Sequence, residues 1–320
     1  MSKSIGLIFP GQGSQYVGMG RDFYEAGISS VKEIFDRASA ALGYDIAKLI
    51  FEGPEEKLKE TLFTQPSVFV VSVAILEALK EELSRVKNVS LKDLVASSAG
   101  HSLGEYTALY SAGVFPDFNV AVSLVSSRAG FIQDCSVKYP GAMAAILGLD
   151  EEVVNKICSD SGAEAVNFNS SGQIVIAGTV AAVEKAMSLA SVQKAIKVVR
   201  LNVSGAFHSS LMKEAAVAMG NTLRGVKLND AAWAVYMNSD GLPTVSADQI
   251  KNKLTVQIDH PVLWEKTMRN MISDGVKKFI EIGPGRVLAG LLKRIDRKIP
   301  VINIEKFSSI KEAVDFLTMD

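Results

Sequence analysis

The sequence predicts an α/β fold with a largely parallel sheet and an inserted small subdomain. Strand and helix signals alternate along almost the whole chain, as they do in parallel α/β sheets. A serine between two glycines follows a strand signal and precedes a helix signal, the arrangement of a nucleophile elbow. From Pro140 to Leu201 the order becomes strand, helix, strand, strand, helix, strand, which is typical of a ferredoxin-like module. We therefore expect an α/β-hydrolase-like core at 1–138 and 202–320, with a ferredoxin-like subdomain at 139–201.

Local signals place the first elements of the core. Ile5–Phe9 is an apolar run ended by a turn signal, and it predicts a buried strand. Ser30-Val-Lys-Glu33 fits a capping box and Gly43 is a typical helix stop, so a helix is expected between them. Ser67–Leu83 is apolar nearly all round, and its length favours a buried helix that begins after Pro66.

The later elements follow from short apolar runs between turn residues. In the core we expect strands and helices in this order: strand 94–99, a helix from 105, helix 120–132, strand 234–237, helix 264–274, strand 278–282 and a helix ending at 294. In the inserted segment we expect strand 143–147, helix 151–158, strands 165–168 and 173–177, helix 180–189 and strand 195–201. Asn169-Ser-Ser-Gly172 predicts a hairpin turn between the two middle strands.

The composition is that of an ordinary soluble globular protein. The 320 residues are 48% hydrophobic and 22% charged, with a formal net charge of -1, so nothing favours wholesale nucleic-acid binding. Cys135 and Cys158 lack neighbours at metal-ligand spacing and are expected to be reduced. No uninterrupted apolar run approaches the length that spans a bilayer, and the N-terminal apolar stretch is too short for a signal peptide. We expect a cytoplasmic protein that binds neither nucleic acid nor membrane.

Gly100-His-Ser-Leu-Gly104 is the one G-x-S-x-G pattern in the sequence. The pattern recurs by chance, so the alternative is a structural serine in a glycine-rich turn. The strand signal before it and the helix signal after it favour an elbow that exposes the Ser102 hydroxyl as a nucleophile. The two glycines permit a sharp turn, and the N-terminus of the following helix favours negative charge.

A serine nucleophile needs a base, and the chain has three histidines. His101 is adjacent to Ser102, so its side chain should diverge from the serine and pack beneath the turn. His260 precedes a proline in a loop-like stretch and fits a surface position. His208 lies among small residues and follows the nucleophile in the chain, as in serine hydrolases. Position in the chain therefore favours His208.

Two further features would complete an acyl-transfer site. The loop Phe9-Pro-Gly-Gln-Gly-Ser-Gln15 is either a plain strand-to-helix turn or a loop whose N–H groups face the nucleophile. An oxyanion needs two such donors, and Gln12 and Leu103 would supply them. Arg128 lies in an apolar helix, where an arginine reaches solvent, forms a buried salt bridge or grips a carboxylate with two hydrogen bonds. The sequence leaves these three alternatives for Arg128 open.

Several motifs occur in one order between Phe9 and about Arg294: Gly11-Gln-Gly-Ser-Gln15, Gly100-His-Ser-Leu-Gly-Glu105, Arg128, Val166-Asn-Phe-Asn169, Gly205-Ala-Phe-His-Ser209 and Gly283-Pro-Gly285. Together they resemble the malonyl-CoA:acyl carrier protein transacylases of fatty acid synthesis. The likeness covers nearly the whole chain. Several motifs in register are far more specific than the elbow alone.

The resemblance implies that Ser102 is the nucleophile and His208 the base. It implies that Gln12 and Leu103 provide the oxyanion N–H groups. This family lacks the acid of a Ser-His-Asp triad and orients its histidine with a backbone carbonyl instead. Gln257 matches the position that supplies this carbonyl.

The resemblance also implies how the substrate is recognised. Arg128 would bind the malonyl carboxylate, and Gln65 matches a polar residue that lines the pocket. Phe207 before the histidine and Leu103 after the serine are the choices of malonyl-selective relatives. Relatives that accept a branched extender tend to carry Ser and Gln at these two positions.

Finally, the resemblance implies malonyl-CoA as substrate, acyl carrier protein as partner, no cofactor of its own and a monomeric state. The alternatives are a malonyl transferase of a polyketide pathway, a serine hydrolase or thioesterase on the same elbow, and a noncatalytic docking module. An acidic carrier would dock on a basic surface, and the alternative for a charge run is a solvated helix end. The candidates for docking are Lys293, Arg294, Arg297 and Lys298.

Overall fold

A six-stranded sheet forms the centre of the molecule. The computed structural model describes residues 3–203 and 205–319. The strands of this sheet are β1 (Ile5–Phe9), β2 (Val95–Gly100), β7 (Ala234–Tyr236), β8 (Pro243–Thr244), β9 (Lys278–Ile282) and β10 (Val301–Ile304). They lie in the order β10-β9-β1-β2-β7-β8. Every neighbouring pair is parallel except β7 and β8.

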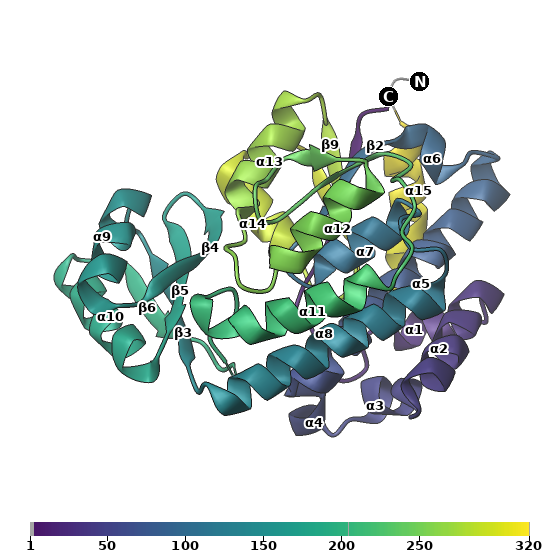
Figure 1. The fold of residues 1–320 in the computed structure, drawn as a ribbon. Helices are drawn as coiled ribbons and strands as arrows, with labels where there is room; N and C mark the ends of the chain where they lie inside the picture. Colours follow the sequence, from purple (N-terminus) through teal and green to yellow (C-terminus); the bar gives the residue numbers. More distant parts are fainter. Residues whose placement is uncertain (1–2, 204, 320) are drawn as a thin grey trace.

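The inserted segment forms a second sheet of its own. Its elements are β3 (Ala142–Leu147), α9 (Glu151–Ser161), β4 (Glu164–Ser170), β5 (Gln173–Gly178), α10 (Val180–Val192) and β6 (Lys197–Arg200). The strands lie in the order β4-β5-β3-β6 and are antiparallel throughout. Figure 1 shows this sheet and its two helices as a separate lobe beside the larger sheet. The predicted α/β fold class, with a mostly parallel sheet and a separate second sheet, is confirmed.

Helices cover both faces of the larger sheet. They are α1 (Arg21–Glu25), α2 (Ser29–Leu42), α3 (Ile46–Glu52), α4 (Glu55–Lys59), α5 (Thr61–Lys87), α6 (Leu91–Leu94), α7 (Gly104–Ser111), α8 (Phe118–Lys138), α11 (Lys213–Arg224), α12 (Ala247–Val256), α13 (Trp264–Ser273), α14 (Val287–Ile295) and α15 (Ile310–Thr318), with 3₁₀ turns at Ser210–Met212 and Phe307–Ser309. Leu7 and Phe9 of β1 share a core cluster with α5, α7 and α8, whereas Ile8 packs with α13 and α14. This alternation follows from the two-residue period of a strand.

Helix α5 begins earlier than predicted. It starts at Thr61, so Pro66 lies inside the helix and does not open it. Proline removes one backbone donor, and the first turn is held by Thr64, whose N–H donates to the Glu60 carbonyl at 2.8 Å. Within the described residues α5 is the one helix long and apolar enough to cross a membrane, but 83% of its apolar window is buried inside the protein. It is therefore a core helix.

The capping box predicted at Ser30 is wrong. Helix α2 begins at Ser29 with Ile28 at the N-cap, so Ser30 lies within the first turn. Its hydroxyl donates to a Glu81 carboxylate oxygen at 2.7 Å on the neighbouring helix α5. The predicted stop is confirmed, because Gly43 caps the helix with a left-handed φ of 76°.

Backbone hydrogen bonds join the small lobe to a short segment of the core that follows α12. The Phe168 N–H donates to the Val262 carbonyl at 2.9 Å, and the Val262 N–H donates to the Val166 carbonyl at 2.8 Å. On the same side, Met143 and Val175 of the small sheet pack against Ala206. The lobe therefore contacts the same stretch of chain that approaches His208.

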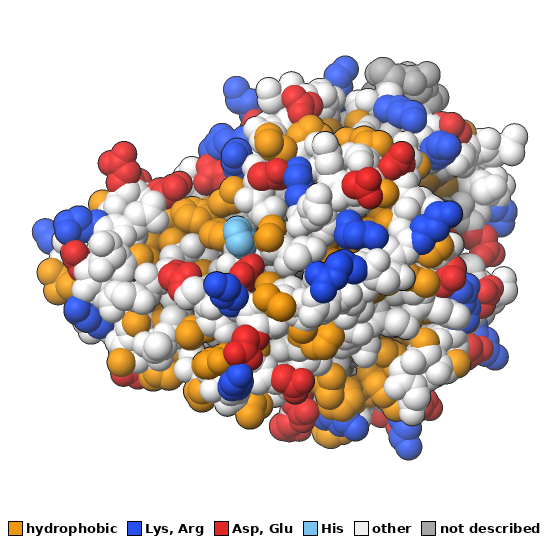
Figure 2. Space-filling view, in the orientation of Figure 1, with side chains coloured by type: hydrophobic (Ala, Val, Ile, Leu, Met, Phe, Trp, Pro, Cys, Tyr) orange, Lys and Arg blue, Asp and Glu red, His pale blue; other side chains and the backbone are white. Residues whose placement is uncertain are grey.

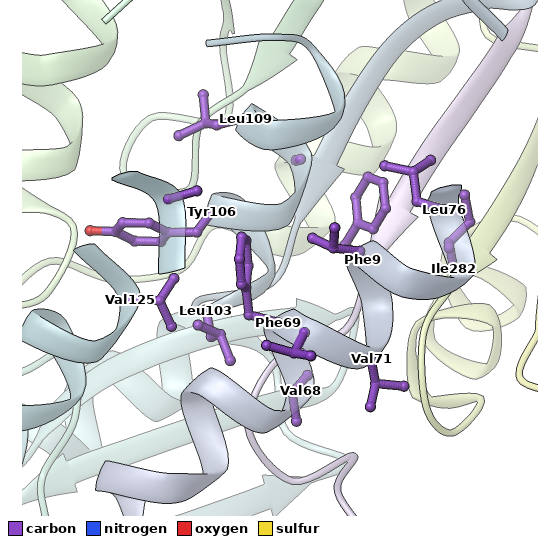
Figure 3. Close-up of a cluster of buried hydrophobic side chains, with 14 of the residues drawn as sticks. Phe9, Val68, Phe69, Val71, Leu76, Leu103, Tyr106, Leu109, Val125 and Ile282 are labelled. Atoms are coloured by element: carbon purple, nitrogen blue, oxygen red, sulfur yellow. The ribbon is translucent and has the colours of Figure 1, made fainter. Parts of the chain in front are cut away.

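The core also fixes the residues around Ser102. Figure 3 shows Leu103 and Tyr106 among the buried side chains of Phe69, Val68 and Val125. Leu103 and Tyr106 are fully buried, so the chain is anchored immediately after Ser102. Close packing of this kind holds the backbone of the turn in one conformation.

Candidate active site

Ser102 lies in a sharp turn between β2 and α7. Its φ of 52° is in the left-handed region, which is uncommon for a residue with a side chain. A Cβ atom on Gly100 would lie 1.9 Å from the Gly104 carbonyl carbon, and one on Gly104 would lie 2.1 Å from the Phe9 carbonyl oxygen. Both glycines of the pattern are therefore required by close approach of the backbone, as the elbow interpretation expects.

Ser102 and His208 are in direct contact. The Ser102 Oγ lies 2.7 Å from His208 Nε2. His208 Nδ1 lies 3.0 Å from the Gln257 carbonyl oxygen and 3.1 Å from the His260 carbonyl oxygen. Carbonyl oxygens only accept, so Nδ1 carries the proton and Nε2 presents its lone pair to the serine.

His208 is poised to act as a base. Burial, and after it the positive charge of Arg128, lower the pKa of His208 from its ordinary value to about 3. The imidazole is therefore neutral at physiological pH and can accept the Ser102 proton. Its backbone φ of 62° is also left-handed, and the His208 N–H donates to the Ile258 carbonyl at 3.1 Å.

Arg128 points into the same site from α8. It is 1% exposed, and its Nη2 donates to Ser102 Oγ at 3.2 Å. Nη1 donates to Gln65 Oε1 at 2.6 Å, while Nε and Nη2 donate to Gln257 Oε1 at 3.2 and 3.0 Å. No carboxylate lies within 4.0 Å of the guanidinium among the described residues. Of the alternatives that the sequence left open, solvent exposure and a buried salt bridge are therefore excluded for the described part of the chain.

The backbone donors expected for an oxyanion lie on two adjoining segments. Gln12 lines the cavity that contains Ser102, and a Cβ on its neighbour Gly11 would lie 3.7 Å from the Leu103 nitrogen. Neither the Gln12 nor the Leu103 N–H donates to an acceptor among residues 3–203 and 205–319. The Ser102 N–H, by contrast, donates to Asn238 Oδ1 at 2.7 Å. Gln12 and Leu103 thus keep free donors beside the serine.

A cavity of about 440 Å³ contains Ser102, His208 and Arg128. This volume lies within the usual range for small-molecule sites. Its walls come from both lobes, and Gln65 and Phe207 are among them, together with Met143, Val175, Leu201, Val203, Val287, Leu288 and Leu291. Figure 2 shows hydrophobic side chains on the surface where the small lobe meets the core.

The other two histidines have structural surroundings. His101 Nε2 lies 2.8 Å from Asn169 Oδ1, and its ring packs 5.5 Å from the Trp264 ring. Burial lowers the pKa of His101, so it too is neutral. His260 is exposed and pairs with Asp259 at 2.8 Å, which matches the surface position expected from the sequence.

The predicted docking cations and the two cysteines have clear positions. Lys293, Arg297 and Lys298 are exposed around the end of α14, and Arg294 donates to Gln173 of the small lobe. The two cysteines are buried and free. The described residues hold no cluster of three or more His, Cys, Asp or Glu side chains that could bind a metal ion.

Sequence reasoning missed two residues that shape the site. Asn238 bonds both to Ser102 and to the Gly100 carbonyl, and Asn169 holds His101. Asn169 lies in one of the motifs that carried the resemblance, which was a usable signal. Asn238 follows a short strand and has no such signal, because its contacts lie 136 and 138 residues away in the chain.

Comparisons with known proteins agree with this geometry. The Acyl transferase domain family matches residues 7–307. The malonyl CoA-acyl carrier protein transacylase of Bacillus subtilis is 41% identical, covering 99% of this chain and 98% of that protein. The protein of the same name from Haemophilus influenzae is 40% identical, covering 98% and 99%.

Solved structures give the same result. The acyl-carrier-protein S-malonyltransferase of Bartonella henselae has a TM-score of 0.93 at 34% identity, covering 99% of this chain and 100% of that chain. A malonyl-transacylase in complex with a type II polyketide acyl-carrier protein has a TM-score of 0.92 at 37% identity, covering 98% and 99%. A domain match of this extent, with relatives of this identity over nearly their full length, establishes that the chain belongs to the acyl transferase domain family.

Proposed function

We propose that this chain is a malonyl-CoA:acyl carrier protein transacylase that supplies fatty acid biosynthesis. The observation that carries the proposal is Arg128, a buried guanidinium 3.2 Å from Ser102 Oγ whose partners among the described residues are all uncharged. A buried charge without a counter-ion is unfavourable, and a substrate carboxylate would satisfy it. A hydrolase of neutral esters has no need of such a group. The names of the relatives at about 40% identity support the same substrate.

The first half-reaction transfers malonyl from coenzyme A to Ser102. His208 Nε2 accepts the Ser102 proton while Oγ attacks the thioester carbonyl carbon. An Oγ–C bond forms, and the carbonyl oxygen becomes an oxyanion that the Gln12 and Leu103 N–H groups stabilise. Each such donor contributes about 3–4 kcal/mol in other serine enzymes. The C–S bond then breaks, and coenzyme A leaves as a thiol with the proton from His208.

The second half-reaction runs the same steps with a different thiol. The phosphopantetheine thiol of the carrier protein gives its proton to His208 and attacks the malonyl-serine ester. The new C–S bond forms, the C–Oγ bond breaks, and His208 returns the proton to Ser102. The protein supplies no cofactor to either half-reaction, because the phosphopantetheine belongs to the partner. Because coenzyme A leaves before the carrier thiol reacts with the malonyl-serine ester, the kinetics are ping-pong.

The backbone of Gln257 takes the place of a triad acid in this scheme. Its carbonyl oxygen accepts a hydrogen bond from His208 Nδ1, 3.0 Å away, and so fixes the tautomer. A neutral carbonyl places less negative charge beside the imidazole than a carboxylate would. That choice agrees with a pKa of about 3 for His208, a base that stays unprotonated between turnovers.

The finer description of the fold is also part of the proposal. We assign an α/β-hydrolase-like core to 1–138 and 202–320, supported by the Ser102 turn between β2 and α7. We assign a ferredoxin-like subdomain to 139–201, supported by the antiparallel order β4-β5-β3-β6. We further propose a cytoplasmic monomer that binds malonyl-CoA in the cavity and docks an acidic carrier protein on the cations that end α14.

The test is intact-protein mass spectrometry after incubation with malonyl-CoA. The proposal expects one malonyl adduct on the wild-type protein, released when carrier protein with its phosphopantetheine is added. The adduct should be lost in Ser102→Ala and retained in Ser209→Ala, a matched serine whose hydroxyl donates to the Ala206 carbonyl. Folded protein that gives no adduct, or an adduct that survives Ser102→Ala, would refute the proposal.

A further inference from the structure

Asn238 lies against the Ser102 turn but takes no part in the proposed chemistry. It follows β7, the strand that pairs with β2, and is 1% exposed. Its side chain spans the turn around the nucleophile. Oδ1 accepts from the Ser102 N–H at 2.7 Å, and Nδ2 donates to the Gly100 carbonyl oxygen at 2.7 Å.

Asn238 is itself held from two directions. Its N–H donates to Glu105 Oε2 at 2.5 Å, and its carbonyl accepts from the Leu263 N–H at 2.9 Å. Glu105 lies in the first turn of α7 and is fully buried. The carboxyl group therefore links the helix that follows the nucleophile to the strand beside it.

The turn needs such a restraint because its backbone is strained. The left-handed region is unfavourable for a residue with a side chain and persists only where the surroundings hold it. Ser102 has a φ of 52°, and relaxation to an ordinary φ would move its Oγ away from His208. Two short hydrogen bonds from one rigid amide oppose that relaxation, because they hold the peptide groups on both sides of His101.

The same contact removes one backbone N–H from the candidate oxyanion donors. Since the Ser102 N–H is already bonded to Asn238, it cannot also serve an oxyanion. The Leu103 and Gln12 N–H groups, which the proposed function uses, have no acceptor among the described residues. Asn238 thus restrains the turn of the nucleophile and occupies one backbone donor beside it.

We propose that Asn238, held by Glu105, is a positioning residue that fixes the Ser102 turn in its reactive conformation. It acts through Ser102, because it is not among the residues that line the cavity and makes no hydrogen bond to Arg128. It should therefore affect every acylation of Ser102 equally and leave the choice of acyl group unchanged. The inference rests on the proposed function only where malonyl transfer is measured.

The test compares Asn238→Asp with the wild-type protein. Aspartate keeps the acceptor for the Ser102 N–H and the size of the side chain, but loses the donor to the Gly100 carbonyl. A fluorophosphonate, which labels activated serines and carries no carboxylate, reports the reactivity of Ser102 directly. We expect its labelling rate to fall about 10- to 100-fold. The kcat/KM values for malonyl-CoA and acetyl-CoA should fall by the same factor, so their ratio stays constant.

The matched control is Asn270→Asp. Asn270 lies on α13, and its Nδ2 donates to the Gly241 carbonyl at 2.9 Å. Asn270→Asp therefore makes the same chemical change away from the Ser102 turn. The labelling rate and turnover of Asn270→Asp should stay at the wild-type level. For every variant, the measured rate is divided by the fraction of folded protein, which thermal unfolding gives. Wild-type labelling in folded Asn238→Asp, or a changed malonyl-to-acetyl ratio, would overturn the proposal.

A second pair of variants decides the matter if Asn238→Asp does not fold. Glu105→Gln keeps an acceptor for the Asn238 N–H, and Glu105→Met removes it at similar length. Labelling should be at least about 10-fold slower in Glu105→Met than in Glu105→Gln, and equal rates in the two would refute the inference. A wild-type protein that is labelled at Ser102 but accepts no malonyl would contradict the proposed function and leave this inference intact.

Discussion

Removal of Arg128 should abolish the preference for malonyl over acetyl. In Arg128→Ala the guanidinium that lies 3.2 Å from Ser102 Oγ is lost. Nη1 and Nη2 can grip a carboxylate with two charge-assisted hydrogen bonds, each worth about 1.5–3 kcal/mol, once Nη2 releases Ser102 Oγ. With part of that energy recovered by water in the enlarged cavity, the net loss is roughly 3–4 kcal/mol. The kcat/KM for malonyl-CoA should then fall about 100- to 1,000-fold.

Acetyl-CoA provides the internal reference. Acetyl has no carboxylate, so it gains nothing from the guanidinium and leaves a buried charge unpaired. Loss of the Arg128 contact to Ser102 Oγ affects both substrates alike, and the ratio of their kcat/KM values removes it. We therefore expect the acetyl value to change less than about tenfold and the malonyl-to-acetyl ratio to fall about 100-fold or more.

The assay is competition between the two thioesters for one purified carrier protein, with products resolved by mass. Arg37→Ala is the matched control, because Arg37 stacks 5.4 Å from the Phe118 ring much as Arg128 lies 5.7 Å from the Tyr106 ring. The ratio should stay at the wild-type value in this control. An unchanged ratio in folded Arg128→Ala would refute the reasoning about the carboxylate.

Three further predictions concern the base, the turn and the neutral partners of Arg128. Burial and Arg128 hold the pKa of His208 at about 3, so the base loses its function only as pH falls toward that value. The pH profile of kcat/KM for acylation should therefore show no fall between about pH 7 and pH 5. A fall in the rate near pH 6.5 would contradict this prediction. Gly100→Ala places a Cβ 1.9 Å from the Gly104 carbonyl, so fluorophosphonate labelling should fall at least about 100-fold. Gly225→Ala should spare labelling, because Gly225 is exposed, has an ordinary φ of -81° and leaves room for a Cβ. In Gln65→Glu a carboxylate would pair with Arg128, so kcat/KM for malonyl-CoA should fall at least about 10-fold while the value for acetyl-CoA is spared. Equal effects on both substrates in the competition assay would argue against the need for uncharged partners around Arg128.

The parts of the fold that the sequence predicts best are those with strong local signals. Ile5–Phe9 and Lys278–Ile282 are observed with the predicted bounds, since an apolar run between turn residues has few alternatives. Helix α11 was not predicted, although its buried residues recur at helical spacing: Ala215, Ala216, Met219, Gly220 and Leu223. This signal was present in the sequence and was missed. The edge strand β10 was also not predicted, because four residues are too few for a clear pattern. Local pattern cannot reveal an element whose stability comes from its neighbours.

The site shows the same division. The Ser102 turn could be expected because the residues that permit it, Gly100 and Gly104, lie beside it in the chain. The orientation of Arg128 could not, since its position on an apolar helix fitted solvent, a salt bridge or a ligand equally well. Its contacts to Gln65 and Gln257 join residues 63 and 129 positions away. Only the packing of α5, α8 and the segment after α12 brings them together.

The chemical type of those two contacts explains how the cavity selects a carboxylated acyl group. Gln65 and Gln257 hold the guanidinium with amide oxygens, which orient it toward Ser102 without neutralising its charge. A glutamate at either position would differ by one atom, yet it would pair with Arg128 and repel the malonyl carboxylate. The buried acid that acts on Arg128, Glu105, does not compensate, because burial raises its pKa to about 8 and keeps it protonated at neutral pH. The positive charge is therefore left for the substrate, and a neutral acyl group cannot satisfy it.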